Sequence, residues 1–145
     1  MTKIILTLIV LLANKAISQE YVIISNGKRT YSFKMNIAVD KTRTILKNES
    51  TFTDSDGDYG ISTCIGTLER LNKQVEYNLK CEGINQNNEK YWATLYRKSN
   101  ENQAGIGSYQ FTGGTGKYEE FKGKSCSYAI RYFSDEIFFF RLMCK

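Results

Sequence analysis

The sequence predicts an all-β fold, a single small antiparallel up-and-down β-barrel of about eight strands with two disulfides. Three observations indicate this fold. Short runs of Tyr, Phe, Ile, Val and Thr alternate with turns rich in Asn, Asp, Gly and Ser. No long segment keeps a helical period. The four cysteines fall opposite one another when neighbouring runs are folded as hairpins.

The N-terminal segment has the pattern of a secretory signal peptide. Lys3 precedes an apolar run from Ile4 to Leu12, and the small residues Ala16 and Ser18 mark a cleavage site. A helix over this run would extend about 14 Å, too short for a bilayer core of about 30 Å. We therefore expect a signal peptide at 1–18 and a β-barrel domain at 19–145. The protein would be exported, periplasmic or secreted, with no stable membrane anchor after cleavage.

The barrel domain divides into nine candidate strands joined by loops of hairpin length. They are Tyr21–Ser25, Tyr31–Val39, Thr44–Thr53, Ile61–Leu71, Gln74–Ile84, Tyr91–Lys98, Ser108–Phe111, Ser125–Phe133 and Ile137–Cys144. Consecutive strands of this kind pair as an antiparallel meander, and closing the meander into a barrel removes its edges. A single helical turn is expected only at Lys117–Phe121.

The cysteines give a register for two of these hairpins. Folding the fourth candidate strand against the fifth about a two-residue turn places Cys64 opposite Cys81. Folding the last two candidate strands together places Cys126 opposite Cys144. Directly opposed residues have Cβ atoms about 4.5–5.5 Å apart, which suits a disulfide. Four cysteines permit two other connectivities, which the sequence leaves open, but no Cys-x-x-Cys spacing indicates a metal-thiolate site.

Aromatic residues are numerous and point to the barrel interior. In the last hairpin, the face that carries the cysteines also pairs Tyr with Leu, Ile with Phe and Tyr with Phe, so it is expected to face the core. A small barrel fills its interior with such residues or leaves a pocket for one apolar ligand. A packed core without a cavity is the alternative. The candidate ligand-binding residues are Trp92, Tyr96, Tyr128, Tyr132, Phe138 and Phe140.

Composition excludes several kinds of chemistry. The chain has no histidine, which removes Ser-His-Asp and Cys-His catalysis, histidine metal sites and imidazole proton transfer. The net charge is +5, but the basic residues are scattered rather than clustered. We therefore expect no nucleic-acid partner, and nothing in the sequence indicates a cofactor.

Two acidic clusters are candidate sites. Asp54, Asp56 and Asp58 alternate as in the start of a calcium loop, but Tyr59 stands where that loop needs glycine. A solvated hairpin loop is the simpler interpretation. Glu119 and Glu120 are the candidate catalytic carboxylates, since a buried carboxyl with a raised pKa can act as a general acid or base. Surface charge is the default interpretation of both, and the sequence assigns no residue a catalytic role.

The segment FTGGTGKYEEFKGKSCSY raises the question of a phosphate-binding loop. Such a loop needs Gly-x4-Gly-Lys-Ser/Thr between a strand and a helix. Counting back from Gly116-Lys117, the first glycine position is occupied by Phe111, and Tyr118 replaces the hydroxyl residue after the lysine. The glycines are better interpreted as a bend between two strands.

This segment, from Phe111, resembles the Phe-x-Gly-Gly-Thr-Gly-Lys-Tyr-x-x-x-x-Gly segment of exported allene oxide cyclase-like β-barrel proteins, and the dirigent proteins of plants carry a related bend. CEGINQNNEKYW, from Cys81, looks like the hairpin of that group in which a cysteine precedes an acidic turn, although here the turn is Asn85 to Glu89. The similarity covers roughly Ile61 to Cys144 and is strongest over 105–124.

The resemblance implies an eight-stranded antiparallel barrel whose interior binds or guides small apolar molecules. In allene oxide cyclases the cavity cyclises a fatty-acid-derived epoxide with a carboxylate and a bound water. Those catalytic positions have no counterpart that can be placed here, and the absence of proline departs from the family pattern, so the activity does not carry over. The expected function is non-catalytic binding of a small apolar ligand. The alternatives are an isomerase or cyclase with a buried carboxylate, and a periplasmic or surface protein-interaction module.

Overall fold

The computed structural model describes residues 20–145, and the predicted signal peptide lies outside them. The described chain forms eight strands and one short 3₁₀ helix. In order these are β1 (Tyr21–Ala38), β2 (Lys41–Asp54), β3 (Tyr59–Leu71), β4 (Gln74–Asn85), β5 (Lys90–Ser99), β6 (Ala104–Gly114), η1 (Gly116–Phe121), β7 (Ser125–Tyr132) and β8 (Ile137–Cys144). The helical turn expected at Lys117–Phe121 is therefore present.

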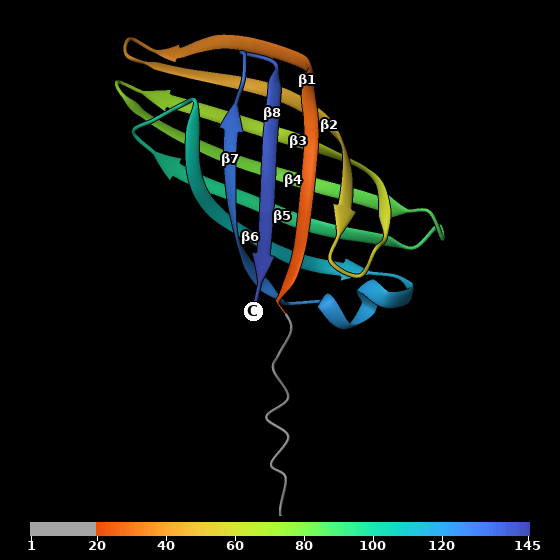
Figure 1. Cartoon of the computed structure of the whole chain (residues 1–145). Coiled ribbons are helices and arrows are strands. Elements are labelled where there is room, and N and C mark those ends of the chain that lie inside the picture. Colours follow the sequence, from red (N-terminus) through yellow and green to blue (C-terminus); the bar gives the residue numbers. More distant parts are fainter. Residues whose placement is uncertain (1–19) are drawn as a thin grey trace, which may run out of the picture.

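The eight strands close into one barrel in sequence order, and every neighbouring pair is antiparallel (Figure 1). The closing contact joins β8 to the first half of β1, from Tyr21 opposite Cys144 to Lys28 opposite Ile137. The predicted up-and-down barrel is confirmed. Its core is formed by inward-facing residues that alternate with outward-facing ones along each strand.

Both predicted hairpin registers are confirmed, and so are both disulfides. Cys64 pairs with Cys81 across β3 and β4, with their Cα atoms 4.0 Å apart. Cys126 is bonded to Cys144 across β7 and β8, with a Cα separation of 4.4 Å. No free cysteine remains within residues 20–145. The second bridge fixes the end of β8, the strand that closes the barrel on β1.

The first strand differs from the prediction. Residues 21–38 form one continuous strand, so the loop expected between the candidate strands Tyr21–Ser25 and Tyr31–Val39, which would contain Asn26-Gly27-Lys28, does not exist. Gly27 lies opposite Phe138 of β8, and a Cβ built on it would lie 2.4 Å from the Phe138 ring. The glycine is needed because an aromatic side chain covers the backbone there, and not because the chain turns. A glycine in a strand and a glycine in a turn look the same in the sequence.

The two ends of the barrel differ. One end carries the four hairpin connections β1–β2, β3–β4, β5–β6 and β7–β8. At the other end, η1 lies across the opening beside the chain termini of the barrel (Figure 1). Among the described residues, no helix is long and apolar enough to cross a membrane.

Candidate functional site

The end of the barrel that carries η1 is closed by aromatic side chains. Tyr118 and Phe121 of η1 are buried, at 0% and 8% exposure. Phe121 packs against Tyr21 of β1 and Phe111 of β6, with ring centroids 4.7 and 5.3 Å apart. Gly116 has a φ of +56°, the left-handed conformation that lets the chain turn from β6 into this helix. The glycine-rich segment therefore leads into η1, whose buried Tyr118 and Phe121 close this end of the barrel, and we call this helix the plug.

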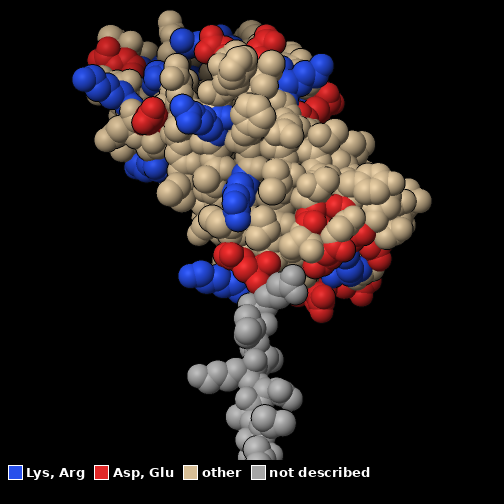
Figure 2. Space-filling view, viewed as in Figure 1, with Lys and Arg blue, Asp and Glu red and all other residues tan. Residues whose placement is uncertain are grey.

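Lys117, the lysine of the Gly-Lys pair, binds the acidic cluster that the sequence marks as a candidate calcium site. Its Nζ lies 2.7 Å from Asp54, 3.3 Å from Asp56 and 2.5 Å from Asp58. The structure thus places an ammonium group, and no open cation position, among these carboxylates. No group of residues in the described part of the chain is arranged to hold a metal ion. Figure 2 shows acidic side chains gathered at this end of the barrel.

The charges of this cluster stabilise one another. Hydrogen bonds from Lys117 and then Gln86 hold the pKa of Asp58 below its usual value. Burial lowers the pKa of Lys117, but hydrogen bonds to Asp54 and Asp58 outweigh that effect and raise it overall. Tyr21 also donates a hydrogen bond of 2.8 Å to Asp54. The cluster ties η1 to the β2–β3 connection and so holds the plug in place.

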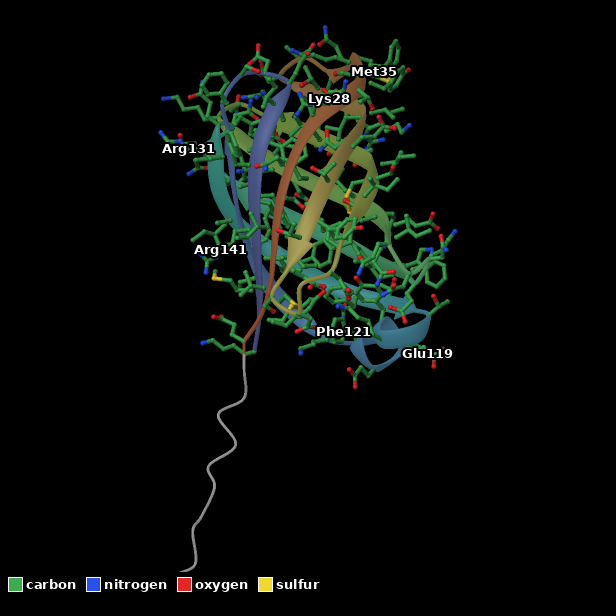
Figure 3. All side chains as sticks on the ribbon, turned by 45° about the vertical axis from the view of Figure 1, so that its right-hand side comes forward. Lys28, Met35, Glu119, Phe121, Arg131 and Arg141 are labelled. Atoms are coloured by element: carbon green, nitrogen blue, oxygen red, sulfur yellow. A yellow bond between two sulfur atoms is a disulfide. The ribbon has the colours of Figure 1, made fainter. Side chains whose placement is uncertain are left out.

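The candidate carboxylates Glu119 and Glu120 do not point into the barrel. Both carboxylates are exposed on η1, and Glu119 projects away from the barrel in Figure 3. The helix buries Tyr118 and Phe121 instead, so the two glutamates between them occupy its outer side.

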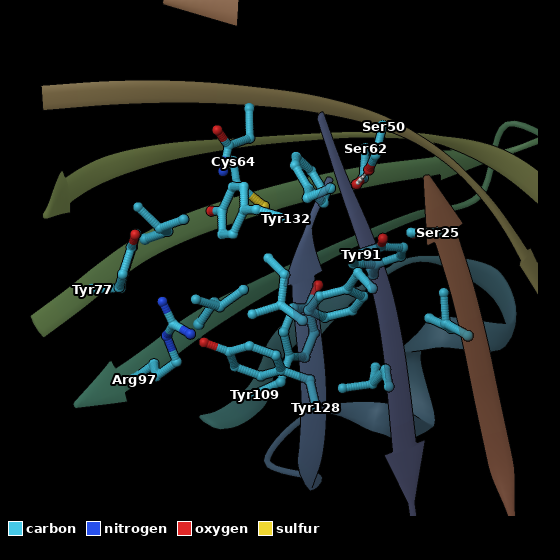
Figure 4. Close-up of a pocket in the computed structure, with 18 residues that line it drawn as sticks. Ser25, Ser50, Ser62, Cys64, Tyr77, Tyr91, Arg97, Tyr109, Tyr128 and Tyr132 are labelled. Atoms are coloured by element: carbon cyan, nitrogen blue, oxygen red, sulfur yellow. Dashed lines mark hydrogen bonds between the residues drawn. The ribbon is translucent and has the colours of Figure 1, made fainter. Parts of the chain in front are cut away.

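The barrel interior contains a cavity of about 40 Å³, which is lined by residues of all eight strands (Figure 4). Its wall is mostly aliphatic and aromatic, with serine, asparagine and arginine as the polar exceptions. The lining residues include Ser25, Asn48, Ser50, Ser62, Tyr77, Tyr91, Arg97, Tyr109, Tyr128, Ile130, Tyr132, Phe138 and Phe140. None of the lining residues in the described chain is acidic. A carboxylate that could act on a substrate inside the barrel is therefore not found there.

Four of the six predicted ligand-binding residues line this cavity, namely Tyr128, Tyr132, Phe138 and Phe140. Trp92 and Tyr96 do not. They lie on the outer face of β5, 39% and 37% exposed, and Trp92 Nε1 donates a 2.9 Å hydrogen bond to Glu82 on the outer surface. The prediction for Trp92 and Tyr96 is wrong because both lie an odd number of positions from the inward-facing Tyr91, and neighbours in a strand face opposite sides. Tyr91 faces inward, and so do the residues two, four and six positions after it.

The inward position six residues after Tyr91 is Arg97, which sequence reasoning missed. Its side chain is 1% exposed and lies over the ring of Tyr77, with the guanidinium carbon 4.6 Å from the ring centroid. Nη2 donates a 3.3 Å hydrogen bond to the backbone oxygen of Asn102, and Nη1 has no partner. The alternation of inward- and outward-facing residues along β5, counted from Tyr91, could have identified Arg97 as an inward-facing residue.

The phenols beside Arg97 are neutral at physiological pH. Burial raises the pKa of Tyr132 to about 12. Burial also raises the pKa of Tyr128, although the nearby Arg97 charge partly opposes the shift. These hydroxyl groups therefore remain hydrogen-bond donors.

A second hollow of about 390 Å³ lies at the end opposite η1, and we call it the vestibule. Its residues come from the β5–β6 and β7–β8 connections and from strands β1, β2, β3, β4 and β7. They are Arg29, Ser32, Lys34, Thr42, Thr44, Leu68, Arg70, Tyr77, Asn102, Gln103, Tyr132, Phe133, Ser134 and Asp135. Tyr77 and Tyr132 line both the vestibule and the cavity, so the two spaces adjoin at these side chains. The vestibule has three basic residues and one acidic residue.

No family model matches the chain, and no match was found among curated proteins.

Proposed function

We propose that the protein is an exported, non-catalytic β-barrel that binds a small, largely apolar molecule in its interior. The observation that carries this proposal is the asymmetry of the barrel. One end is covered by η1, and the other carries the vestibule, which adjoins the apolar cavity. Ligand pockets are typically concave and apolar with a few convergent polar groups. Here those groups are Arg97, Asn48 and the phenols of the cavity.

The size of the spaces limits the ligand. The cavity alone accommodates only a short apolar group, while the vestibule has the volume of an ordinary small-molecule pocket. A molecule that binds would therefore span both, with its apolar part inside and its remainder between Arg29 and Arg70 at the mouth.

One structural fact and one sequence pattern support export. Two disulfides and no free cysteine within residues 20–145 suit an oxidising compartment. The signal-peptide pattern at 1–18 points the same way. The barrel is also the architecture that the resemblance to allene oxide cyclase-like and dirigent-like proteins implies, and we retain that kinship as part of the proposal.

The two alternatives have less support. A cyclase or isomerase would need a carboxylate in the barrel interior, and Glu119 and Glu120 lie outside it. The outer surface does expose apolar side chains such as Ile61 and Phe139. Nothing in the described chain indicates what would cover them, so a protein-interaction function is not proposed.

Binding is tested first with neutral probes. n-Alkanols of about four to ten carbons should bind the purified protein in ligand-observed NMR, because they need only an apolar space with a polar mouth. Ile130→Phe fills the cavity and should abolish the signal. Ala129→Phe adds the same ring to the outer face of β7 and should leave it unchanged.

A second experiment looks for the natural ligand. Native mass spectrometry of the protein purified from its own host should show a retained small molecule that Ile130→Phe loses. The proposal fails if the host protein carries no such molecule and neither the alkanols nor the corresponding carboxylic acids bind.

A further inference from the structure

Arg97 is a buried cation without a counter-charge. None of the ion pairs within residues 20–145 includes it, and none of the residues lining its cavity is acidic. An arginine cannot lose its proton in a protein, so it cannot escape the cost of burial by becoming neutral. Buried charges are normally paired, because an unpaired one costs several kcal/mol. The folded barrel therefore keeps a positive charge that no described side chain balances.

The contacts that Arg97 does make are incomplete. The Tyr77 ring supplies a cation–π contact, and Asn102 accepts one long hydrogen bond. Nη1 is left without an acceptor. A guanidinium group has five N–H donors, and one carbonyl oxygen satisfies only a small part of that capacity.

The barrel makes room for this side chain. Gly105 on β6 lies beside it, and a Cβ built on Gly105 would come within 2.4 Å of Nη1. Figure 4 shows Arg97 extending from its strand into the cavity, toward Tyr77 and Tyr128. Arg97 lies directly opposite Tyr77 in the pairing of β4 with β5, and Tyr77 lines both the cavity and the vestibule. The charge of Arg97 therefore lies in the cavity beside the boundary with the vestibule, which Tyr77 and Tyr132 form and which we call the neck.

The charges of the side chains around the neck favour the binding of an anion. Arg29, Lys34 and Arg70 line the vestibule, against Asp135 alone on the acidic side. A funnel lined mostly by one sign of charge raises the local concentration of the opposite sign. The phenol of Tyr132 beside the neck remains a neutral donor, and Arg29 stacks over its ring at 5.6 Å.

We propose that the ligand of this barrel carries a carboxylate that binds Arg97 at the neck, with a short apolar group in the cavity. The inference rests on the proposed function, since it specifies the chemistry of the molecule bound there. A carboxylate matches the planar fork of a guanidinium group and can accept two parallel hydrogen bonds from it. It would supply both the missing acceptor and the missing negative charge.

The test compares n-alkanoates with n-alkanols of equal chain length, by isothermal titration calorimetry at neutral pH. The acid should bind roughly tenfold or more tightly than the alcohol, because its hydrogen bonds are to a charged group. Arg97→Met should remove this preference while alcohol binding remains. Arg131→Met removes an exposed arginine on the outer face of β7 (Figure 3) and should keep the preference.

The outcomes separate this inference from the function on which it rests. Equal binding of acid and alcohol by the wild-type protein, or an acid preference that survives in Arg97→Met, overturns the carboxylate site and leaves the binding function intact. Binding of neither probe overturns the carboxylate site, and it overturns the binding function as well when the protein from its own host retains no small molecule. If Arg97→Met does not fold, the wild-type comparison still decides, and Arg97→Lys, which keeps the charge without the fork, should bind the acid more weakly than the wild type. Inorganic phosphate serves as a competitor for the alkanoate. At a carboxylate site, phosphate should displace the alkanoate only when its concentration is far above that of the alkanoate.

Discussion

The ammonium nitrogen of Lys117 lies 2.7 Å from a carboxylate oxygen of Asp54, a residue 63 positions earlier in the chain. The Asp54 side chain is fully buried, and Lys117 is the cation that compensates it. Asp58 and Asp56 contact the same nitrogen. The plug at the closed end of the barrel thus depends on one lysine from η1 and three aspartates, one at the end of β2 and two in the β2–β3 connection.

Replacing this lysine should destabilise the barrel. Lys117→Met leaves three carboxylates without a cation, and we expect a loss of about 3 kcal/mol in the free energy of unfolding, as for other broken buried pairs. Lys90→Met is the control, because Lys90 forms an exposed pair with Glu82 at 3.6 Å, and such pairs contribute at most about 1 kcal/mol. Urea denaturation followed by circular dichroism measures both. Equal losses in the two variants would contradict the role given to Lys117.

The same cluster makes stability depend on acid. The pKa of Asp58 is held below its ordinary value of 3.8 in the folded protein. A carboxyl group with a depressed pKa contributes stability above its unfolded pKa and loses that contribution as the pH falls through the folded value. The free energy of unfolding should therefore decrease as the pH is lowered below about 4. Asp58→Asn should show a shallower decrease in urea titrations at successive pH values, and a slope equal to that of the wild type would contradict this assignment.

The two disulfides should contribute similarly to stability. Cys64–Cys81 and Cys126–Cys144 close loops with sequence separations of 17 and 18. Loops of this length predict about 3 kcal/mol for each bridge on the chain-entropy model. Urea denaturation of the variants Cys64→Ala/Cys81→Ala and Cys126→Ala/Cys144→Ala measures the two losses. A much larger loss for the second pair would indicate that closure of β8 on β1 depends on its bridge beyond the chain-entropy effect.

Gly105 should be required for the anion site. Gly105→Ala places a Cβ against Arg97 Nη1, so the guanidinium group must move, and overpacking of this kind costs about 1–3 kcal/mol. We expect weaker binding of alkanoates and a smaller effect on alkanols. Gly113→Ala on the same strand is the control, because its nearest new contact would be the Trp92 side chain at 3.5 Å, an ordinary distance. Calorimetry of both variants checks the difference, and unchanged alkanoate affinity in Gly105→Ala would count against the site.

Much of the fold could be predicted because a β-meander is a local structure. Alternation and turn residues located the strands, and the cysteine spacing confirmed two registers, since opposed residues in a hairpin have positions with a constant sum. The failure at Asn26-Gly27-Lys28 has a physical cause. Gly27 accommodates a ring from β8, and no local pattern reveals which distant side chain will lie over a glycine.

The candidate site was harder to predict than the fold. Tyr128, Tyr132, Phe138 and Phe140 were found because the disulfide register fixed the inward face of β7 and β8. On β5 no cysteine fixed the face, and aromatic character alone placed Trp92 on the wrong side. Arg97 was missed because a charged residue is expected on the outside. The Lys117 cluster was missed because it joins segments far apart in the sequence.

Closure of the barrel by β1 and β8 also determines from which end of the barrel the molecule can be attached to a surface or to another domain. Tyr21 and Cys144 are neighbours at the plugged end (Figure 1), and the vestibule lies at the other end. Any tether, tag or fused domain attached at either terminus of the barrel therefore leaves from the side remote from the mouth. Immobilisation through the N-terminus or through the C-terminus should orient the barrel alike, with the vestibule facing solution and free to exchange ligand.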